Sequence, residues 1–196
     1  IRGGDVIIAS STSATMPSVL QEDALYPETI LVGHPYNPSY LLPLIEVCGG
    51  TKTSEENTQK AMEIYKGMGK VPVHCKKEVP GFIVNRLSWS AMDIAKENVM
   101  NGVCSVEDMD KAIMYGPGMR MAVTGQILTL RLGVQGGLRA VAAKYGKEPS
   151  ESDLVCADGV DEEIANRPEK WGNTVEGVEK FRDKMFAEIL KAQGLL

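Results

Sequence analysis

The chain has 196 residues, of which 43% are hydrophobic and 24% are charged, a composition typical of a globular protein with one large domain or two small ones. The formal net charge of -5 leaves no overall basic field for nucleic acid or for an anionic membrane. The four cysteines lie far apart, and no apolar run approaches the roughly 20 residues that span a bilayer. We therefore expect a cytoplasmic protein with no metal site, no nucleic-acid partner and no membrane segment.

Residues 1–79 have the pattern of an α/β segment, in which short β-branched runs alternate with helical signals. Strands are predicted at 6–9, 30–33, 44–48 and 71–75, and helices from residue 16 and at 55–66. Ser54 is the expected N-cap of the second helix. The first strand, "VIIA", is typical of a buried strand in a parallel sheet, and no initiator Met precedes it. We therefore expect that the chain lacks its natural N-terminal part.

Residues 80–196 have the pattern of a second, all-helical domain. After "VPGF", a helical periodicity begins, which predicts an amphipathic helix whose one face carries Ile83, Leu87, Ala91, Ile94 and Asn98 at steps of three or four residues. Further helices are predicted from Ser105 to Gly116 and from Asn173 to Gly194. A polar surface loop is predicted at 167–173, because that stretch is rich in residues that break helices.

One of only two histidines, His34, follows the apolar strand "ILVG" in the stretch "GHPYNP". It therefore stands at the carboxyl end of a predicted strand, where α/β sheets place their ligand sites. The alternative is a turn histidine that is satisfied by backbone hydrogen bonds. The second histidine, His74, has no acidic residue placed to activate it, and we interpret it as structural.

Glu46 lies inside the apolar strand "PLIEVC", where an unpaired carboxylate is costly to bury. An imidazole N–H is a suitable donor for it, because a buried carboxylate fixes the ring's tautomer, stabilises the imidazolium and leaves the other ring nitrogen free as a base. The alternative is an edge strand that exposes Glu46 to solvent. We hypothesise a pair between His34 and Glu46.

Two further groups of polar residues carry weaker signals. The run "SSTS" at 10–13 follows the first strand and offers hydroxyls to a ligand, although such a cluster is also typical of a helix-capping loop. Asn85 lies in the first turns of the helix after "VPGF", where its amide either points at a site or faces solvent.

The segments "SSTS", "GHPYNP", "LIEVCGG" and "KKEVPGFIVNRL" follow one another in an order and spacing that resemble the L-3-hydroxyacyl-CoA dehydrogenase superfamily. The run "EVPGFIVNRL" is close to that family's signature at the junction of its two domains. The resemblance implies the α/β fold class, with the C-terminal part of a Rossmann-type dinucleotide-binding domain at 1–79 and an all-α helical domain at 80–196. It also implies NAD as the cofactor, a small-molecule substrate and a homodimer.

The resemblance further implies a role for each polar position. His34 would take the proton of a secondary alcohol, and Glu46 would stabilise the imidazolium that forms. Ser13 and Asn85 would hydrogen-bond the reacting oxygen, where charge develops in the transition state. On the cofactor side, the resemblance points to Ser11, Ser13 and Asn37.

The sequence departs from the family pattern in two respects. It has no G-x-G-x-x-G loop to hold the cofactor's pyrophosphate, so we expect these 196 residues alone to bind NAD poorly and to be inactive. The turn "YGPG" leads into "MRMAVTGQ" instead of the "P-M-G-P-F" of the fatty-acid enzymes, which is more similar to the lambda-crystallin and L-carnitine dehydrogenase branch. Arg120 is then a candidate ligand for a substrate carboxylate, the alternative being a solvated arginine at a helix start.

The sequence thus predicts an NAD-dependent oxidoreductase that oxidises the 3-hydroxyl of a 3-hydroxyacyl-CoA or of a small 3-hydroxy acid. A rival of a different class is a crystallin-like structural protein, or a dimerisation module, that keeps the fold without turnover. The polar positions count against the rival, because a packing protein has no physical need for a buried carboxylate beside a histidine.

Overall fold

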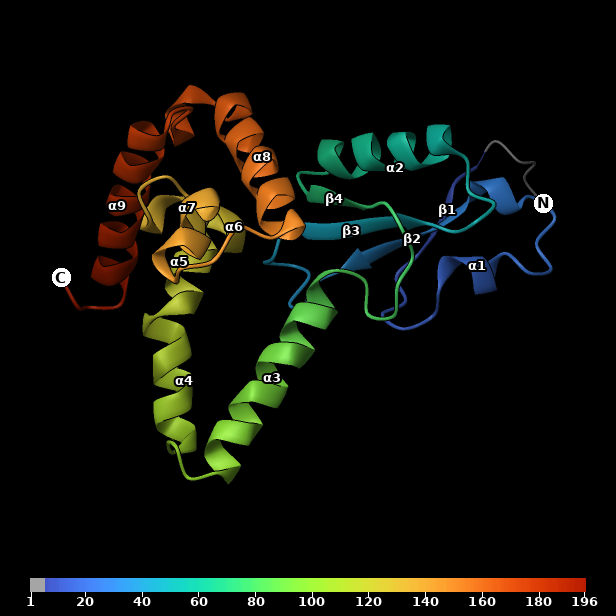
Figure 1. The fold of residues 1–196 in the computed structure, drawn as a ribbon. Helices are drawn as coiled ribbons and strands as arrows, with labels where there is room; N and C mark the ends of the chain where they lie inside the picture. Colours follow the sequence, from blue (N-terminus) through green and yellow to red (C-terminus); the bar gives the residue numbers. More distant parts are fainter. Residues whose placement is uncertain (1–5) are drawn as a thin grey trace. The chain divides into compact units, whose positions relative to one another are not determined.

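The computed structural model describes residues 6–196 (Figure 1). The chain divides into two compact units, Ile1–Glu97 and Asn98–Leu196. The first unit holds every strand of the described residues, and the second is helical. Most of the helix that begins at Val84 belongs to the first unit, together with the sheet. The predicted division into domains after residue 79 stays a prediction.

The first unit is built on a four-stranded sheet whose strands lie in the order β1-β2-β3-β4 (Figure 1). The strands are β1 (Ile8–Ser10), β2 (Ile30–Pro35), β3 (Leu44–Gly49) and β4 (Val71–Cys75). β1 pairs with β2 in parallel, β2 with β3 antiparallel, and β3 with β4 in parallel. The four predicted strands are therefore present, with β1 starting two residues late. β1 was expected to be buried, but Ile8 is 57% exposed because β1 lies at the sheet edge in the described residues.

Helix α2 (Glu55–Gly67) covers one face of the sheet, and α1 (Pro17–Leu20) and the short 3-10 helix η1 (Pro27–Thr29) connect β1 to β2 (Figure 1). The predicted N-cap is confirmed, because the Ser54 side chain accepts a hydrogen bond from the Asn57 N–H. Side chains alternate between the two faces of the strands and form two clusters. One cluster contains Leu31, Ile45, Val47 and Ala61, and the other contains Val32, Cys48, Cys75 and Phe82.

Gly33 in β2 lies against the Tyr65 side chain of α2. A Cβ at this position would come within 2.1 Å of the Tyr65 hydroxyl oxygen, so a larger residue would force the Tyr65 ring to move. The glycine immediately before His34 therefore leaves room for the Tyr65 ring against the strand.

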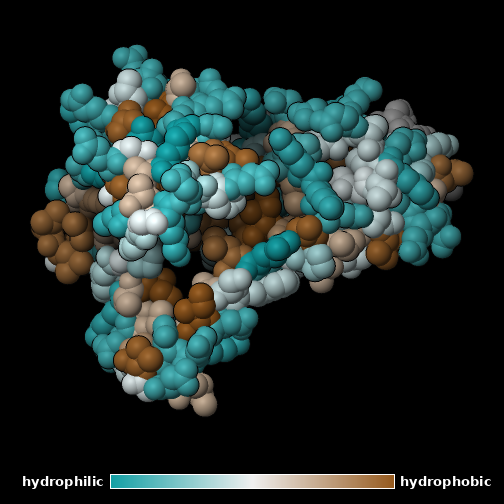
Figure 2. Space-filling view, viewed as in Figure 1, coloured by the Kyte–Doolittle hydropathy of each residue, from teal (hydrophilic) through white to brown (hydrophobic). Residues whose placement is uncertain are grey.

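Helix α3 (Val84–Met100) follows a tight turn at Gly81 and Phe82, both of which have positive φ. The helix was predicted from its apolar periodicity, yet it has no buried residue in the part of the chain that the structure describes. Apolar side chains also stay exposed where α3 runs into the second unit, and Figure 2 shows them as brown patches near the lower end of the view. These exposed residues include Met100, Val103 and Val106.

The second unit consists of helices α4 (Val106–Tyr115), α5 (Pro117–Thr124), α6 (Gln126–Gly133), α7 (Leu138–Lys144), α8 (Glu151–Asn166), η2 (Glu169–Trp171) and α9 (Val175–Ala192). Ser105 caps α4 as predicted. The last helix was expected to open at Asn173, but its N-cap is Thr174, whose hydroxyl accepts from the Gly177 N–H. The predicted loop at 167–173 contains η2, so it is partly helical.

The core of the second unit is a cluster of buried aliphatic residues from α6, α7, α8 and α9, namely Leu128, Leu138, Ala157, Val160, Ile164 and Val178. At its surface, hydrogen bonds from Arg131 and Arg139 hold the pKa of Asp161 below its usual range and tie α8 to α6 and α7. Within residues 6–196, none of the helices combines the length and the apolar character needed to cross a bilayer.

Candidate active site

His34 and Glu46 form a buried pair in the middle of the sheet. The antiparallel register of β2 and β3 places the two residues directly opposite each other, so their side chains leave the same face. His34 Nδ1 lies 2.8 Å from Glu46 Oε2, and the two residues are 3% and 0% exposed. Glu46 is therefore not on an exposed edge, and His34 is not satisfied by the backbone alone.

The second carboxylate oxygen of Glu46 accepts two hydrogen bonds from the start of α3. The backbone N–H groups of Ile83 and Val84 donate to Oε1 at 2.7 and 3.1 Å. The first N–H groups of a helix lack partners within the helix and favour an anion, so the carboxylate is stabilised there. The Phe82 ring packs against the imidazole, with ring centroids 5.2 Å apart.

Ser13 completes the surroundings of the imidazole. Its Oγ lies 3.1 Å from His34 Nε2, on a loop that the Thr12 hydroxyl stabilises by accepting from the Ala14 and Thr15 N–H groups. An ionised carboxylate only accepts hydrogen bonds, so Nδ1 is the donor beside it, and in the neutral imidazole Nε2 then accepts from the Ser13 hydroxyl. The arrangement leaves Nε2 facing the loop after β1.

The structure brings Ser13, His34 and Glu46 together, but it leaves the other predicted residues outside this cluster. Asn85 is half-buried in the first turn of α3, next to Val84, and forms no side-chain hydrogen bond with any residue from 6 to 196. The remaining cofactor-side residues, Ser11 and Asn37, are exposed on the loops that follow β1 and β2. The roles predicted for these three residues stay predictions.

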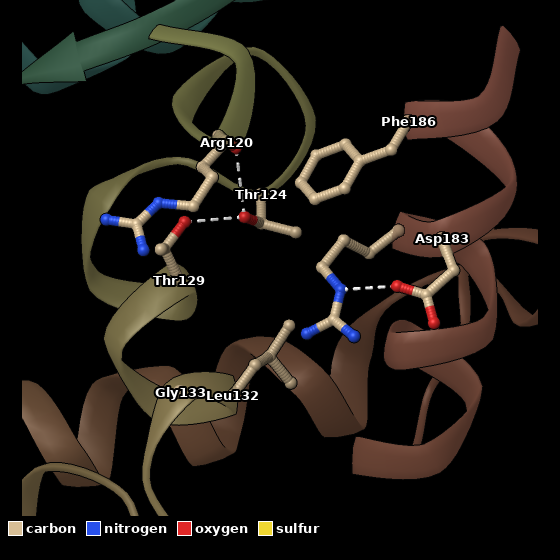
Figure 3. Close-up of a pocket in the computed structure, with 8 residues that line it drawn as sticks. Arg120, Thr124, Thr129, Leu132, Gly133, Asp183 and Phe186 are labelled. Carbon is tan, nitrogen blue, oxygen red and sulfur yellow. Dashed lines mark hydrogen bonds and ion pairs between the residues drawn. The ribbon is translucent and has the colours of Figure 1, made fainter. Parts of the chain in front are cut away.

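Arg120 belongs to the second unit, where it lines a pocket of about 210 Å³ between α5, α6 and α9 (Figure 3). Thr124 and Thr129 share a hydrogen bond in the pocket wall. A second guanidinium, that of Arg182, is paired with Asp183. The exposed Arg120 has no carboxylate within ion-pair distance in the described part of the chain.

Several contacts of the site were missed by the sequence reasoning. The backbone donors at Ile83 and Val84 leave no trace in residue identity. Phe82 was recognised only as part of a junction motif. A hydrogen bond between the Tyr36 hydroxyl and Ser88 Oγ, 2.8 Å long, also lacks any local signal, because its partners are far apart in the sequence.

A sheet of the α/β dinucleotide-binding type, with a buried histidine and carboxylate on its two central strands and helices following, is typical of a Rossmann-type domain joined to a helical domain. Residues 1–79 match the NAD binding domain of 3-hydroxyacyl-CoA dehydrogenase, and residues 81–173 match the C-terminal domain of the same family. The chain belongs to the 3-hydroxyacyl-CoA dehydrogenase superfamily, and the predicted fold class is confirmed.

Curated relatives agree with the branch that the sequence resembles. L-carnitine dehydrogenase from Pseudomonas syringae pv. syringae is 36% identical over 96% of this chain and 62% of the relative. L-carnitine dehydrogenase from Bacillus cereus is 37% identical over 95% of this chain and 60% of the relative. The chain thus spans about three fifths of the length of these relatives.

Solved structures give the same picture of the fold. A structure of 5-formyl-3-hydroxy-2-methylpyridine 4-carboxylic acid 5-dehydrogenase, an NAD⁺-dependent dismutase, has a TM-score of 0.68 at 25% identity and covers 98% of this chain and 66% of that one. A 3-hydroxyacyl-CoA dehydrogenase from Archaeoglobus fulgidus has a TM-score of 0.72 at 19% identity, over 98% of this chain and 69% of that one, which supports the fold alone.

Proposed function

We propose that this chain is the catalytic part of an NAD-dependent dehydrogenase that oxidises the 3-hydroxyl of a 3-hydroxyacyl-CoA or of a small 3-hydroxy acid. The observation that carries the proposal is the imidazole of His34 held between Glu46 and Ser13. An aliphatic core would not need a histidine–carboxylate pair. Burial of such a pair is costly unless every polar atom in it finds a partner.

In this proposal His34 acts as the general base. Its Nε2 takes the proton of the substrate hydroxyl, and the Nδ1–H bond to Glu46 stabilises the imidazolium that forms. The Ser13 hydroxyl, now bonded to Nε2, hydrogen-bonds the same substrate oxygen, with Asn85 as a second donor. NAD, when bound, would supply the acceptor for the hydride of the substrate carbon.

The residues of this chain fit the nicotinamide end of the cofactor. The loop after β1 carries Ser11 and Ser13 at the carboxyl end of a strand that pairs in parallel with β2, the position at which such sheets bind nucleotides. Asn37 follows β2 at the same edge. The printed sequence has no G-x-G-x-x-G turn that could hold a pyrophosphate.

Residues 1–196 expressed alone should therefore bind NADH only weakly. A nicotinamide contact without a pyrophosphate site retains little of the cofactor's binding energy. Isothermal titration calorimetry of residues 1–196 checks the expectation, with the complete gene product as the control. Low-micromolar binding to residues 1–196 would contradict it.

Arg120 is the proposed ligand of a substrate carboxylate, because its guanidinium is exposed at a pocket and has no acidic partner in the described residues. Arg120→Met should raise KM for a free hydroxy acid at least about tenfold, since a charged hydrogen bond contributes about 1.5–3 kcal/mol. Arg182→Met removes the other guanidinium of the pocket and is the matched control. An unchanged KM in Arg120→Met would remove Arg120 from the site.

The deciding experiment measures NADH formation by the complete gene product with 3-hydroxybutyryl-CoA, 3-hydroxybutyrate, L-carnitine and L-gulonate side by side. Preference for the thioester would place the protein with the fatty-acid enzymes and make Arg120 incidental. Preference for a free acid would favour the small-hydroxy-acid branch. No NADH from any of the four would count against the proposed function.

We also propose a cytoplasmic homodimer. The apolar side chains that α3 leaves exposed, among them Leu87 and Ile94, support an interface there, because a monomer gains nothing from exposing a helical apolar stripe. Sedimentation velocity of the complete gene product tests this, and a monomer at micromolar concentration would contradict it.

A further inference from the structure

The hydrogen bond between Tyr36 and Ser88 joins the strand of the candidate base to the helix of the candidate amide. Tyr36 lies two residues after His34, directly after β2 ends at Pro35. Ser88 lies three residues after Asn85 on α3, so the two residues share one side of the helix. The Tyr36 hydroxyl oxygen and Ser88 Oγ are 2.8 Å apart, and both residues are half-buried.

The start of α3 is attached to the sheet mainly by polar contacts. Glu46 accepts from the backbone of Ile83 and Val84 at the first turn, and Tyr36 bonds Ser88 one turn later. α3 itself has no fully buried residue. Apolar packing at the turn accompanies the polar contacts, because Phe82, just before the helix, is 1% exposed and the Trp89 ring lies against Gly81. Two separate attachment points fix both the direction of a helix and its rotation about its axis.

We propose that Tyr36 and Ser88 are positioning residues that hold the first turns of α3 in one orientation, and thereby place Asn85 beside the oxygen that reacts. The inference rests on the proposed function of Asn85. Asn85 lies between the two attachment points, next to Val84 and one turn before Ser88. Neither hydroxyl belongs to the His34, Glu46 and Ser13 cluster, so the pair acts through α3 and not on the substrate.

The test uses the complete gene product with its best substrate. Tyr36→Phe keeps the ring but removes the bond, and it should lower kcat about tenfold, because small displacements of a positioned group are costly in rate. KM for NAD should change less than twofold. Ser88→Ala should have the same effect, and Ser88→Thr, which keeps a hydroxyl, should restore most of kcat. Tyr40→Phe is the matched control, because Tyr40 is 84% exposed and makes no side-chain hydrogen bond within residues 6–196.

A double-mutant cycle with Asn85→Ala distinguishes positioning of Asn85 by Tyr36 from a merely structural role of Tyr36. If Tyr36 acts through Asn85, then Tyr36→Phe should change kcat less than twofold once Asn85 is absent. A second tenfold loss in that background would overturn the proposal. A kcat within twofold of wild type in Tyr36→Phe would also overturn it.

Amide hydrogen exchange gives a readout that does not depend on turnover. Residues 83–88 should exchange at least about fivefold faster in Tyr36→Phe and in Ser88→Ala than in wild type, because the helix start opens more easily. Unchanged exchange would overturn the proposed clamp. If the wild type oxidises no substrate but the variants do exchange faster, the proposed function is wrong, and the clamp stands without its catalytic role.

Discussion

Replacing His34 with glutamine should lower turnover at least about 10²-fold while the protein stays folded, because a positioned general base contributes about 10²- to 10⁴-fold. The glutamine amide can still donate a hydrogen bond to Glu46, so the buried carboxylate keeps a partner. It cannot accept a proton at neutral pH. The measurement is kcat with the best substrate, together with circular dichroism and a thermal melt to show that the fold is retained.

The control is His74→Gln, which removes the only other histidine. His74 lies in β4, where it pairs in register with Val47, and it is not part of the buried cluster. Its replacement should leave kcat within twofold of wild type. Activity of His34→Gln within threefold of wild type would end the assignment of His34 as the base.

The sequence predicts those residues of the site whose side-chain type is unusual for their position in a predicted strand or loop. His34 was found because it follows an apolar strand, where α/β sheets place their ligand sites, and Glu46 because a carboxylate inside an apolar strand is costly without a partner. The run of hydroxyls at 10–13 after the first strand was only a weak signal, and Ser13 was singled out within it by the family resemblance. The antiparallel register that places His34 opposite Glu46 was not predicted, although it is what brings the two together.

The missed parts depend on the backbone or on contacts between distant segments. Every residue except proline has a backbone N–H group, so nothing in the identity of Ile83 and Val84 marks them as donors. Only the fold shows that their N–H groups meet Glu46. The Tyr36 and Ser88 bond joins residues 52 positions apart. The capping box of α8, Ser150 with Asp153, was present in the sequence and was overlooked.

Glu46→Gln should also lower turnover at least about 10²-fold, but through the tautomer of His34. A carboxylate can only accept from Nδ1, which keeps Nε2 free to take a proton. The glutamine NH₂ group donates to Nδ1 instead, so the ring proton moves to Nε2, where the substrate proton would have to go. The glutamine oxygen still accepts from Ile83 and Val84, so the fold loses little. Steady-state kinetics and urea unfolding measure the two effects separately.

Glu46→Ala is the matched contrast, because it removes both carboxylate oxygens and leaves the Nδ1–H of His34 and two backbone N–H groups without an acceptor. Removing one partner of a buried pair costs about 3–5 kcal/mol, so we expect the free energy of unfolding to fall by at least about 3 kcal/mol, against about 1 kcal/mol or less for Glu46→Gln. Equal losses in the two variants would mean that the oxygen atoms of Glu46 do not stabilise α3.

The double variant Glu46→Gln, His34→Phe separates an enzyme from a crystallin-like structural protein of the same fold. A structural protein has no turnover to lose, and the exchange of a buried polar pair for a less polar one should make it markedly more stable. A dehydrogenase should lose turnover at least about 10²-fold, whatever the change in stability, because the pair is kept for chemistry and not for packing. A large rise in melting temperature from an inactive wild type would therefore favour the structural protein.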